Sequence, residues 1–192
     1  RSGMGSSSAF TVGLLNALYA YRGENISERQ LAVESIHIEQ NLVGENVGSQ
    51  DQVNAAYGGL NKIKFFQDGE IDVEPARIND DVIRHLDRHL MLFYTGIQRT
   101  AATIAATYTE NILSKEKQLK RLHAMVDESE SILKEANNLD EFGNLLHEAW
   151  MEKRSLSAKV STHRVDNLYE AAREAGALGG KLAGAGGGGM LL

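Results

Sequence analysis

Gly3-Met4-Gly5-Ser6-Ser7-Ser8-Ala9 stands at the beginning of the chain and runs directly into an apolar repeat with helical spacing. Glycine lets a backbone turn tightly and approach a ligand, and serine is a favoured residue at a helix start. The stretch therefore predicts a loop that ends at a helix N-terminus, where N–H groups and the helix dipole can bind a phosphate. The apolar repeat comprises Phe10, Val12, Leu14, Leu15 and Leu18.

This interpretation has an alternative. The Lys-Ser/Thr pair that follows the second glycine of a P-loop is absent, so the stretch is not that motif. A Gly/Ser-rich start beside Arg1, a first residue other than methionine, is also typical of a cloning linker. Features elsewhere in the chain are needed to distinguish a phosphate-binding loop from a linker.

The composition predicts a soluble globular protein of one or two domains, which we expect in the cytoplasm. The chain has 192 residues, a net charge of −6 and no cysteine, which rules out disulfides and thiolate metal sites. No run reaches the roughly 20 apolar residues that span a bilayer, so we expect no membrane partner. The acidic balance argues against a nucleic-acid partner. One group of basic residues is interspersed with acidic ones and indicates a solvated helix face: Lys115, Lys117, Lys120 and Arg121.

The spacing of apolar residues predicts an α+β mixture rather than a regular alternation of strands and helices. Asp68-Gly69 predicts a hairpin turn, Ser27 to Gln30 a capping box, and Asp140 the N-cap of its helix. Helices are expected over residues 6–21, from 28 onward, and over 78–88, 103–137, 140–155 and 164–175. Strands are expected over 60–66 and 71–75, over the apolar run 90–94 as a buried strand, and from 190 on.

A second glycine-rich stretch covers residues 179–189. A flexible linker would have this composition, but a linker does not usually lie between an amphipathic helix and an apolar strand. Two glycine-rich turns in one chain predict a backbone that comes close to something bulky and charged at both places.

Two carboxylates flank a glycine-bearing loop: Glu39 near the end of an expected helix, and Asp51 just after the loop. A carboxylate at the negative end of a helix favours a cation, and Mg²⁺ bound to phosphate is a natural one. The alternative is an exposed surface pair. The histidine patterns lack the further ligands of known metal motifs, so we interpret them as structural or surface residues: Glu34-x-x-His37, His85 with His89, and His147-Glu148.

Taken together, three segments resemble the galactokinase, homoserine kinase, mevalonate kinase and phosphomevalonate kinase (GHMP) superfamily. They are the opening Gly/Ser stretch, Gly48-Ser49-Gln50-Asp51-Gln52, and Lys181 to Gly189. With the expected strand end Leu92-Phe93-Tyr94-Thr95-Gly96, the chain looks closest to the D-glycero-D-manno-heptose 7-phosphate kinase branch. The resemblance covers essentially the whole chain.

The resemblance implies a two-domain fold of which the chain is a fragment. Residues 1–79 would be the C-terminal half of a ribosomal-protein-S5-like, ATP-binding N-terminal domain. Residues 80–192 would be most of a ferredoxin-like C-terminal domain. We expect the N-terminal sugar-binding motif and the C-terminal end of these kinases to be missing, and the fragment alone to be weakly active or inactive.

The resemblance also assigns site residues. ATP phosphates would lie against Gly3, Gly5, Ser6, Ser7 and Ser8, with Gly184, Gly186 and Gly187 closing the site. Ser7 and Glu39 would hold Mg²⁺. Asp51 would act on the acceptor hydroxyl, either as a general base or as a group that orients it.

In the heptose branch the acceptor is the anomeric hydroxyl of a sugar already phosphorylated at its far end, and the product is the 1,7-bisphosphate. Arg99 and Lys159 are candidates for that remote phosphate, and Lys181 for assistance at the glycine turn. Other acceptors stay open, namely galactose, fucose and mevalonate. A non-catalytic nucleotide- or sugar-binding protein is the alternative from another class.

Overall fold

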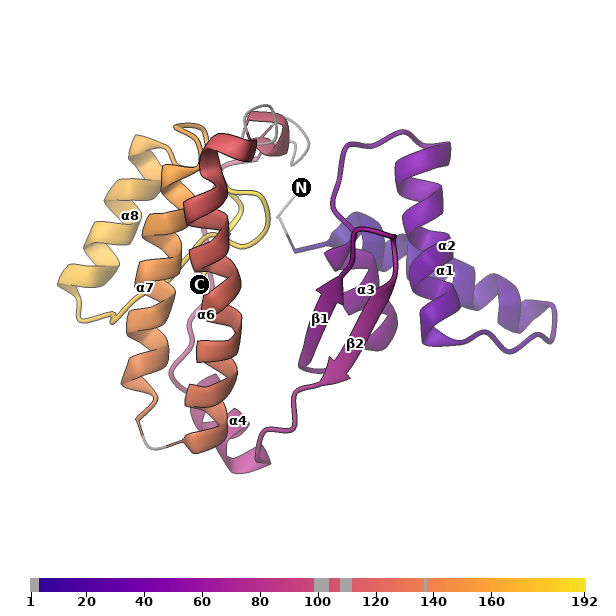
Figure 1. The fold of residues 1–192 in the computed structure, drawn as a ribbon, viewed down its shortest axis with the longest axis horizontal. Helices are drawn as coiled ribbons and strands as arrows, with labels where there is room; N and C mark the ends of the chain where they lie inside the picture. The colour runs from indigo at the N-terminus through magenta and orange to yellow at the C-terminus, as the bar shows by residue number, and fades with distance from the viewer. Residues whose placement is uncertain (1–3, 99–103, 108–111, 137) are drawn as a thin grey trace. The chain divides into compact units, whose positions relative to one another are not determined.

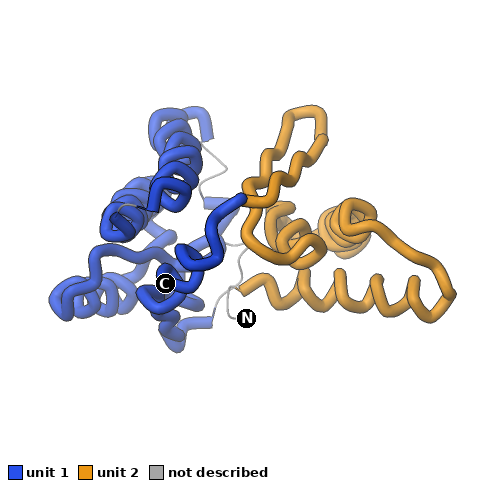
Figure 2. Tube along the Cα trace, turned by 90° about the horizontal axis from the view of Figure 1, so that it is seen from below, with its two compact units in different colours: residues 1–3, 77–192 blue, residues 4–76 orange. Residues whose placement is uncertain are grey.

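The computed structural model describes residues 4–98, 104–107, 112–136 and 138–192. It divides into a smaller unit, residues 4–76, and a larger unit that includes residues 77–192 (Figure 2). The division falls three residues before the expected domain boundary at residue 79. Among the helices of the described ranges, none is both long and apolar enough to cross a membrane.

The smaller unit consists of helices and one β-hairpin (Figure 1). Its α2 continues directly into a π-helix, and its two strands pair antiparallel with Ile63 opposite Val73. In chain order the elements are α1 (Ser6–Tyr21), α2 (Glu28–His37), the π-helix (Ile38–Leu42), α3 (Gln50–Tyr57), β1 (Asn61–Phe65) and β2 (Ile71–Pro75).

Local sequence signals account for these boundaries. Ser27 Oγ accepts a hydrogen bond from the Gln30 N–H at 3.2 Å, which caps α2 as expected. Gly23 adopts a left-handed conformation just past α1, with φ of 73°, as the C-terminal residue of a helix often does. At the hairpin turn Asp68 Oδ1 accepts from the Glu70 N–H at 3.0 Å, and Gly69 has φ of 88°.

The larger unit places three long helices beside a small antiparallel pair of strands. Arg121 on α6 bonds to Glu148 on α7 at 2.7 Å and also to Glu128, so this member of the basic group is paired with acidic residues. The elements are α4 (Asp80–Asp87), β3 (Phe93–Tyr94), a 3-10 helix (Ile112–Lys115), α6 (Glu116–Glu135), α7 (Asp140–Ser155), α8 (His163–Glu174) and β4 (Met190–Leu191).

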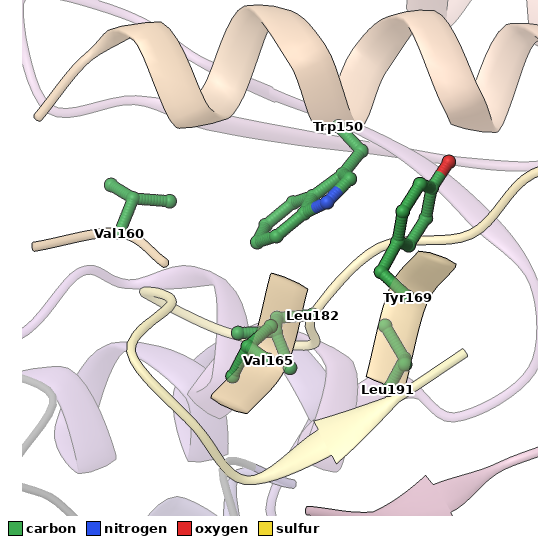
Figure 3. Close-up of a cluster of buried hydrophobic side chains, with 6 residues drawn as sticks. All are labelled: Trp150, Val160, Val165, Tyr169, Leu182 and Leu191. Carbon is green, nitrogen blue, oxygen red and sulfur yellow. The ribbon is translucent and has the colours of Figure 1, made fainter. Parts of the chain in front are cut away.

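The core of the larger unit gathers around Trp150 of α7, which is fully buried. Figure 3 shows the indole against side chains from α8 and from the chain segments on either side of the glycine-rich loop. Burying aromatic and branched side chains at about 25 cal/mol per Å² is the main force that holds this unit together. The cluster comprises Trp150, Val160, Val165, Tyr169, Leu182 and Leu191.

Three expectations are wrong in detail. The run 90–94 forms a strand only at Phe93–Tyr94, and both residues are half exposed, because β3 pairs with only the two residues of β4. Asp140 does not cap α7. Asn138 Oδ1 accepts the Asp140 N–H instead, at 3.1 Å. The helix expected over 103–137 is not continuous, since a 3-10 turn precedes α6.

Candidate active site

The first turn of α1 begins at Gly5, whose left-handed conformation (φ 62°) turns the chain into the helix. Its carbonyl accepts the Ala9 N–H at 2.8 Å, the first bond of the helix. In an α-helix the N–H groups of the first turn have no acceptor within the helix. Ser6, Ser7 and Ser8 therefore occupy the kind of turn that binds phosphate through its main chain.

The carboxylate of Glu39 lies beside this turn and is buried, with 4% of the residue exposed. Ser8 Oγ donates to Oε2 at 2.9 Å, and Gln52 Nε2 donates to the same oxygen at 2.6 Å. Thr11 Oγ1 donates to Oε1 at 3.1 Å. All three donors are neutral, and within the described ranges no lysine, arginine or histidine forms an ion pair with this carboxylate.

The π-helix determines where Glu39 points. Val43 N–H donates to the Ile38 carbonyl at 2.8 Å, a bond that spans five residues instead of four. Gln40, next in the chain, donates to the Val47 carbonyl at 3.0 Å and to Ser49 Oγ at 3.1 Å. One widened turn thus presents Glu39 to α1 and at the same time anchors the loop that leads to α3.

Asp51 lies in the first turn of α3, against the loop before α1. A Cβ built on Gly5 would come within 3.2 Å of Asp51 Cβ and Cγ and within 3.3 Å of Oδ2. Burial raises the pKa of the Asp51 carboxyl, a hydrogen bond from Gln50 opposes this, and the negative charge of Glu39 adds to the increase. The phosphate-type turn and both predicted carboxylates therefore meet in one unit.

The structure distinguishes Ser7 from Ser8, which the motif alone does not. Ser7 is exposed, and its carbonyl lies 3.1 Å from Thr11 Oγ1, so it shares the single Thr11 hydroxyl proton with Glu39 Oε1, whereas Ser8 is buried and bonded to Glu39. The sequence assigned Ser7, together with Glu39, to Mg²⁺. In this structure Ser8 is the serine in contact with Glu39.

A buried carboxylate without a cationic partner is chemically suited to a divalent cation, because burying an unpaired charge is costly. Carboxylate and hydroxyl oxygens are the ligands that Mg²⁺ prefers, alongside phosphate oxygens. Within the described ranges no three His, Asp or Glu side chains cluster closely enough to bind a metal unaided. The residues present thus fit a cation that arrives with phosphate.

The glycine-rich loop of the larger unit joins two short paired segments, 181–183 and 190–192. At Gly186 (φ 106°) a Cβ would lie 2.7 Å from the Val160 carbonyl oxygen, and at Gly188 2.7 Å from Ile97 Cβ. Gly187 N–H donates to the Val160 carbonyl at 2.6 Å. Packing against the protein itself therefore requires glycine at 186 and 188, whatever else the loop binds.

Two lysines lie at the base of this loop. Lys153 Nζ of α7 bonds to the carbonyl of Gly184, a contact that no sequence motif indicated. The backbone of Lys181 pairs with Leu192, and burial lowers the pKa of its amino group. The loop is further fixed by Thr95, whose Oγ1 donates to the Gly189 carbonyl at 2.8 Å.

Gly3 and Arg99 lie outside the described residues, and Lys159 is exposed. His147 Nδ1 is bonded to the Tyr169 hydroxyl at 2.5 Å. A cavity of about 760 Å³ in the larger unit is lined by α4, the start of α7 and residues 176–179, and contains none of the predicted site residues.

Comparison with known families gives two matches in sequence order. The model of the GHMP kinases N-terminal domain matches residues 1–59, and that of the GHMP kinases C terminus matches residues 119–192.

Among individual proteins, the chain is 32% identical over its whole length to D-glycero-alpha-D-manno-heptose 7-phosphate kinase of Campylobacter jejuni, covering 57% of that protein. It is 31% identical to the mevalonate kinase of Methanothermobacter thermautotrophicus, covering 59%. The chain thus spans less than two thirds of the relatives that it matches. A D-glycero-D-manno-heptose 1-phosphate kinase from Bacteroides thetaiotaomicron has a similar fold, with a TM-score of 0.74 at 23% identity, over 99% of this chain and 52% of that one.

Proposed function

The chain belongs to the GHMP kinases, and on this premise we propose that it takes part in the ATP-dependent transfer of a phosphoryl group to a hydroxyl of a sugar phosphate. The observation that supports this most directly is the grouping within one unit of the first turn of α1, Glu39 and Asp51. A non-enzymatic binding protein would have little need of both carboxylates beside a phosphate-type turn.

Phosphoryl transfer depends mainly on positioning and on neutralising charge. Main-chain groups of the turn at Gly5 to Ser8 would bind the phosphates of ATP. Glu39 and a serine hydroxyl of that turn would hold Mg²⁺, which when bound neutralises phosphate charge. Gly184, Gly186 and Gly187 would contribute the second glycine turn.

Asp51 is the residue that we assign to the acceptor. Its raised pKa makes the carboxylate a stronger proton acceptor than an ordinary aspartate, which suits a general base. The same carboxylate would equally orient the acceptor hydroxyl and stabilise charge.

For the acceptor, we propose D-glycero-D-manno-heptose 7-phosphate, phosphorylated on its anomeric hydroxyl to the 1,7-bisphosphate. The support is the name of the Campylobacter relative together with the motif sequence of this chain. The remote phosphate of that acceptor requires cationic side chains, for which Lys159 and Arg99 stay candidates.

The test is an ADP-release assay with ATP and Mg²⁺, run on this chain and on the natural gene product that contains it. Heptose 7-phosphate, galactose, fucose and mevalonate are offered in parallel. We expect turnover on the heptose phosphate by the gene product, with the chain alone weak or inactive. An Asp51→Asn variant should be slower by about 10² or more.

Other results redirect the proposal. Turnover on galactose, fucose or mevalonate alone would keep the kinase and replace the acceptor. ATP binding without turnover on any of the four would favour the non-catalytic binding protein. If neither the gene product nor the chain binds ATP, the kinase proposal is wrong.

A further inference from the structure

The side chain of Gln52 is fully buried, and only one of its two polar atoms has a hydrogen-bond partner among the described residues. Its Nε2 donates to Glu39 Oε2 at 2.6 Å, the shortest of the bonds to that carboxylate. Its Oε1 has no hydrogen-bond partner among the residues that the structure describes. The proposed function assigns no role to this side chain.

An unpartnered buried amide oxygen destabilises the fold, because it has lost its bonds to water without replacement. Turning the Gln52 amide over would not recover this, because its oxygen would then face an ionised carboxylate at hydrogen-bond distance. The negative charge of Glu39 therefore fixes the orientation of the amide, and the fold tolerates the unpartnered oxygen as a consequence.

The donors to Glu39 come from two different helices. Ser8 and Thr11 are on α1, and Gln52 is on α3. An ionised carboxylate can accept about four hydrogen bonds or metal contacts, so three neutral donors orient the group and leave accepting capacity for a cation. Without the Gln52 donor, the carboxylate would be held only by the two donors on α1.

We propose that Gln52 is a positioning residue, which holds the Glu39 carboxylate in the orientation in which it binds the divalent cation of the nucleotide. This inference rests on the proposed function, since it needs a cation at Glu39. Asp51 precedes Gln52 in the first turn of α3, so the same turn carries the acceptor-side carboxylate and the amide that fixes the metal-side one.

The experiment compares Gln52→Met, which keeps length and removes the donor, with a matched control. Gln30→Met removes a similar bond that does not involve Glu39, because Gln30 is exposed on α2 and its Nε2 donates to Glu34 Oε1 at 2.8 Å. The probe is Mn²⁺, titrated by electron paramagnetic resonance into the chain with a non-hydrolysable ATP analogue. Thermal midpoints are recorded for all variants.

We expect Gln52→Met to weaken Mn²⁺ binding about 10-fold, within the range known for residues that orient metal ligands, and Gln30→Met to leave it unchanged. Excess Mn²⁺ should restore full occupancy in Gln52→Met. A lower thermal midpoint with unchanged Mn²⁺ affinity would show a merely structural role and overturn the inference.

A second measurement tests the contact without using metal. The side-chain amide protons of Gln52 should resonate downfield in an NMR spectrum of the chain and shift in a Glu39→Gln variant. No response to that variant would overturn the inference and leave the kinase proposal intact. A responsive amide in a chain that binds neither Mn²⁺ nor the ATP analogue would overturn both.

Discussion

Asp51 lies directly against Gly5, so that a single added methyl group at Gly5 would come within 3.2 Å of the aspartate side chain. The positive φ of Gly5, 62°, disfavours any side chain there as well, by roughly 1–2 kcal/mol. The loop and the carboxylate are therefore not independent: a change in one displaces the other.

Gly5→Ala should accordingly destabilise the chain and reduce turnover of the gene product at least about 10-fold by displacing Asp51. Gly13→Ala is the matched control. Gly13 is an exposed residue within α1 with nothing within 4 Å of an added Cβ, and its replacement should stabilise the chain by about 0.5–1 kcal/mol. Thermal unfolding and ADP release measure the two effects. Equal behaviour of the two alanine variants would contradict the close approach of Asp51 to Gly5.

Asp51→Asn should separate activity from stability. The pKa of Asp51 is raised in the folded state, so its ionised form destabilises the fold, and protonation relieves this as pH falls through the folded-state pKa. The asparagine variant should therefore have a higher unfolding midpoint than wild type at pH 7, and the gain should shrink at acid pH. An unfolding midpoint that is lower than wild type at pH 7 would argue against the desolvated carboxylate.

The pH dependence of turnover follows from the same shift. The acid limb of kcat/KM should lie above the pH at which an ordinary aspartate titrates, because activity is lost when Asp51 is protonated. A profile from pH 4 to 8 for the natural gene product measures this. An acid limb at or below the ordinary value would exclude Asp51 as its source.

The two serines of the first turn should differ in what they support. Ser8→Ala removes a buried hydrogen bond to Glu39 and should lower stability by about 1 kcal/mol. Ser7→Ala changes an exposed side chain and should leave stability within about 0.5 kcal/mol of wild type. If Ser7 holds the cation, its alanine variant should nevertheless need more Mg²⁺ for half-maximal turnover. A normal Mg²⁺ requirement would move that role to Ser8.

Thr95→Val tests the anchor of the glycine-rich loop. The Thr95 hydroxyl donates to the Gly189 carbonyl and accepts the Gly189 N–H at 3.1 Å, both buried. Valine preserves the shape and removes both hydroxyl bonds. The Gly189 carbonyl still accepts the Thr95 N–H at 2.9 Å, and the Gly189 N–H still donates to the Ile97 carbonyl at 3.1 Å, so the loss should be about 1 kcal/mol by denaturant unfolding. Thr95→Ser keeps the hydroxyl and should lose much less. Similar losses in both variants would assign the effect to packing of the methyl group.

Much of the local structure could be predicted from the sequence, because its signals act over a few residues. Ser27 caps α2, Gly23 ends α1, and Asp68-Gly69 turns the hairpin, each as its short-range chemistry requires. The apolar run 90–94 was misjudged as a buried strand. Burial depends on how many partners a strand has, and apolar composition does not report this.

The candidate site was harder to predict for a geometric reason. Neighbouring residues of a helix point about 100° apart, so a motif that contains several serines does not specify which one faces a given carboxylate. Ser8 was predicted to lie against the ATP phosphates, but the contacts of Ser8, Thr11 and Gln52 with Glu39 depend on how α1, α3 and the π-helix pack together. Lys153 was missed because its contact with Gly184 joins residues far apart in the chain.

The widened turn at Ile38–Leu42 gives this arrangement an evolutionary vulnerability. A π-turn is equivalent to one residue inserted into an α-helix, so a single-codon deletion there would restore ordinary helical phase. If the deletion precedes Glu39, the helical residues from Glu39 to the irregular segment at 43–49 would then rotate by about 100° relative to α2. A lineage could thus lose the inward-facing Glu39 in one in-frame event without any substitution at the three residues that hold it.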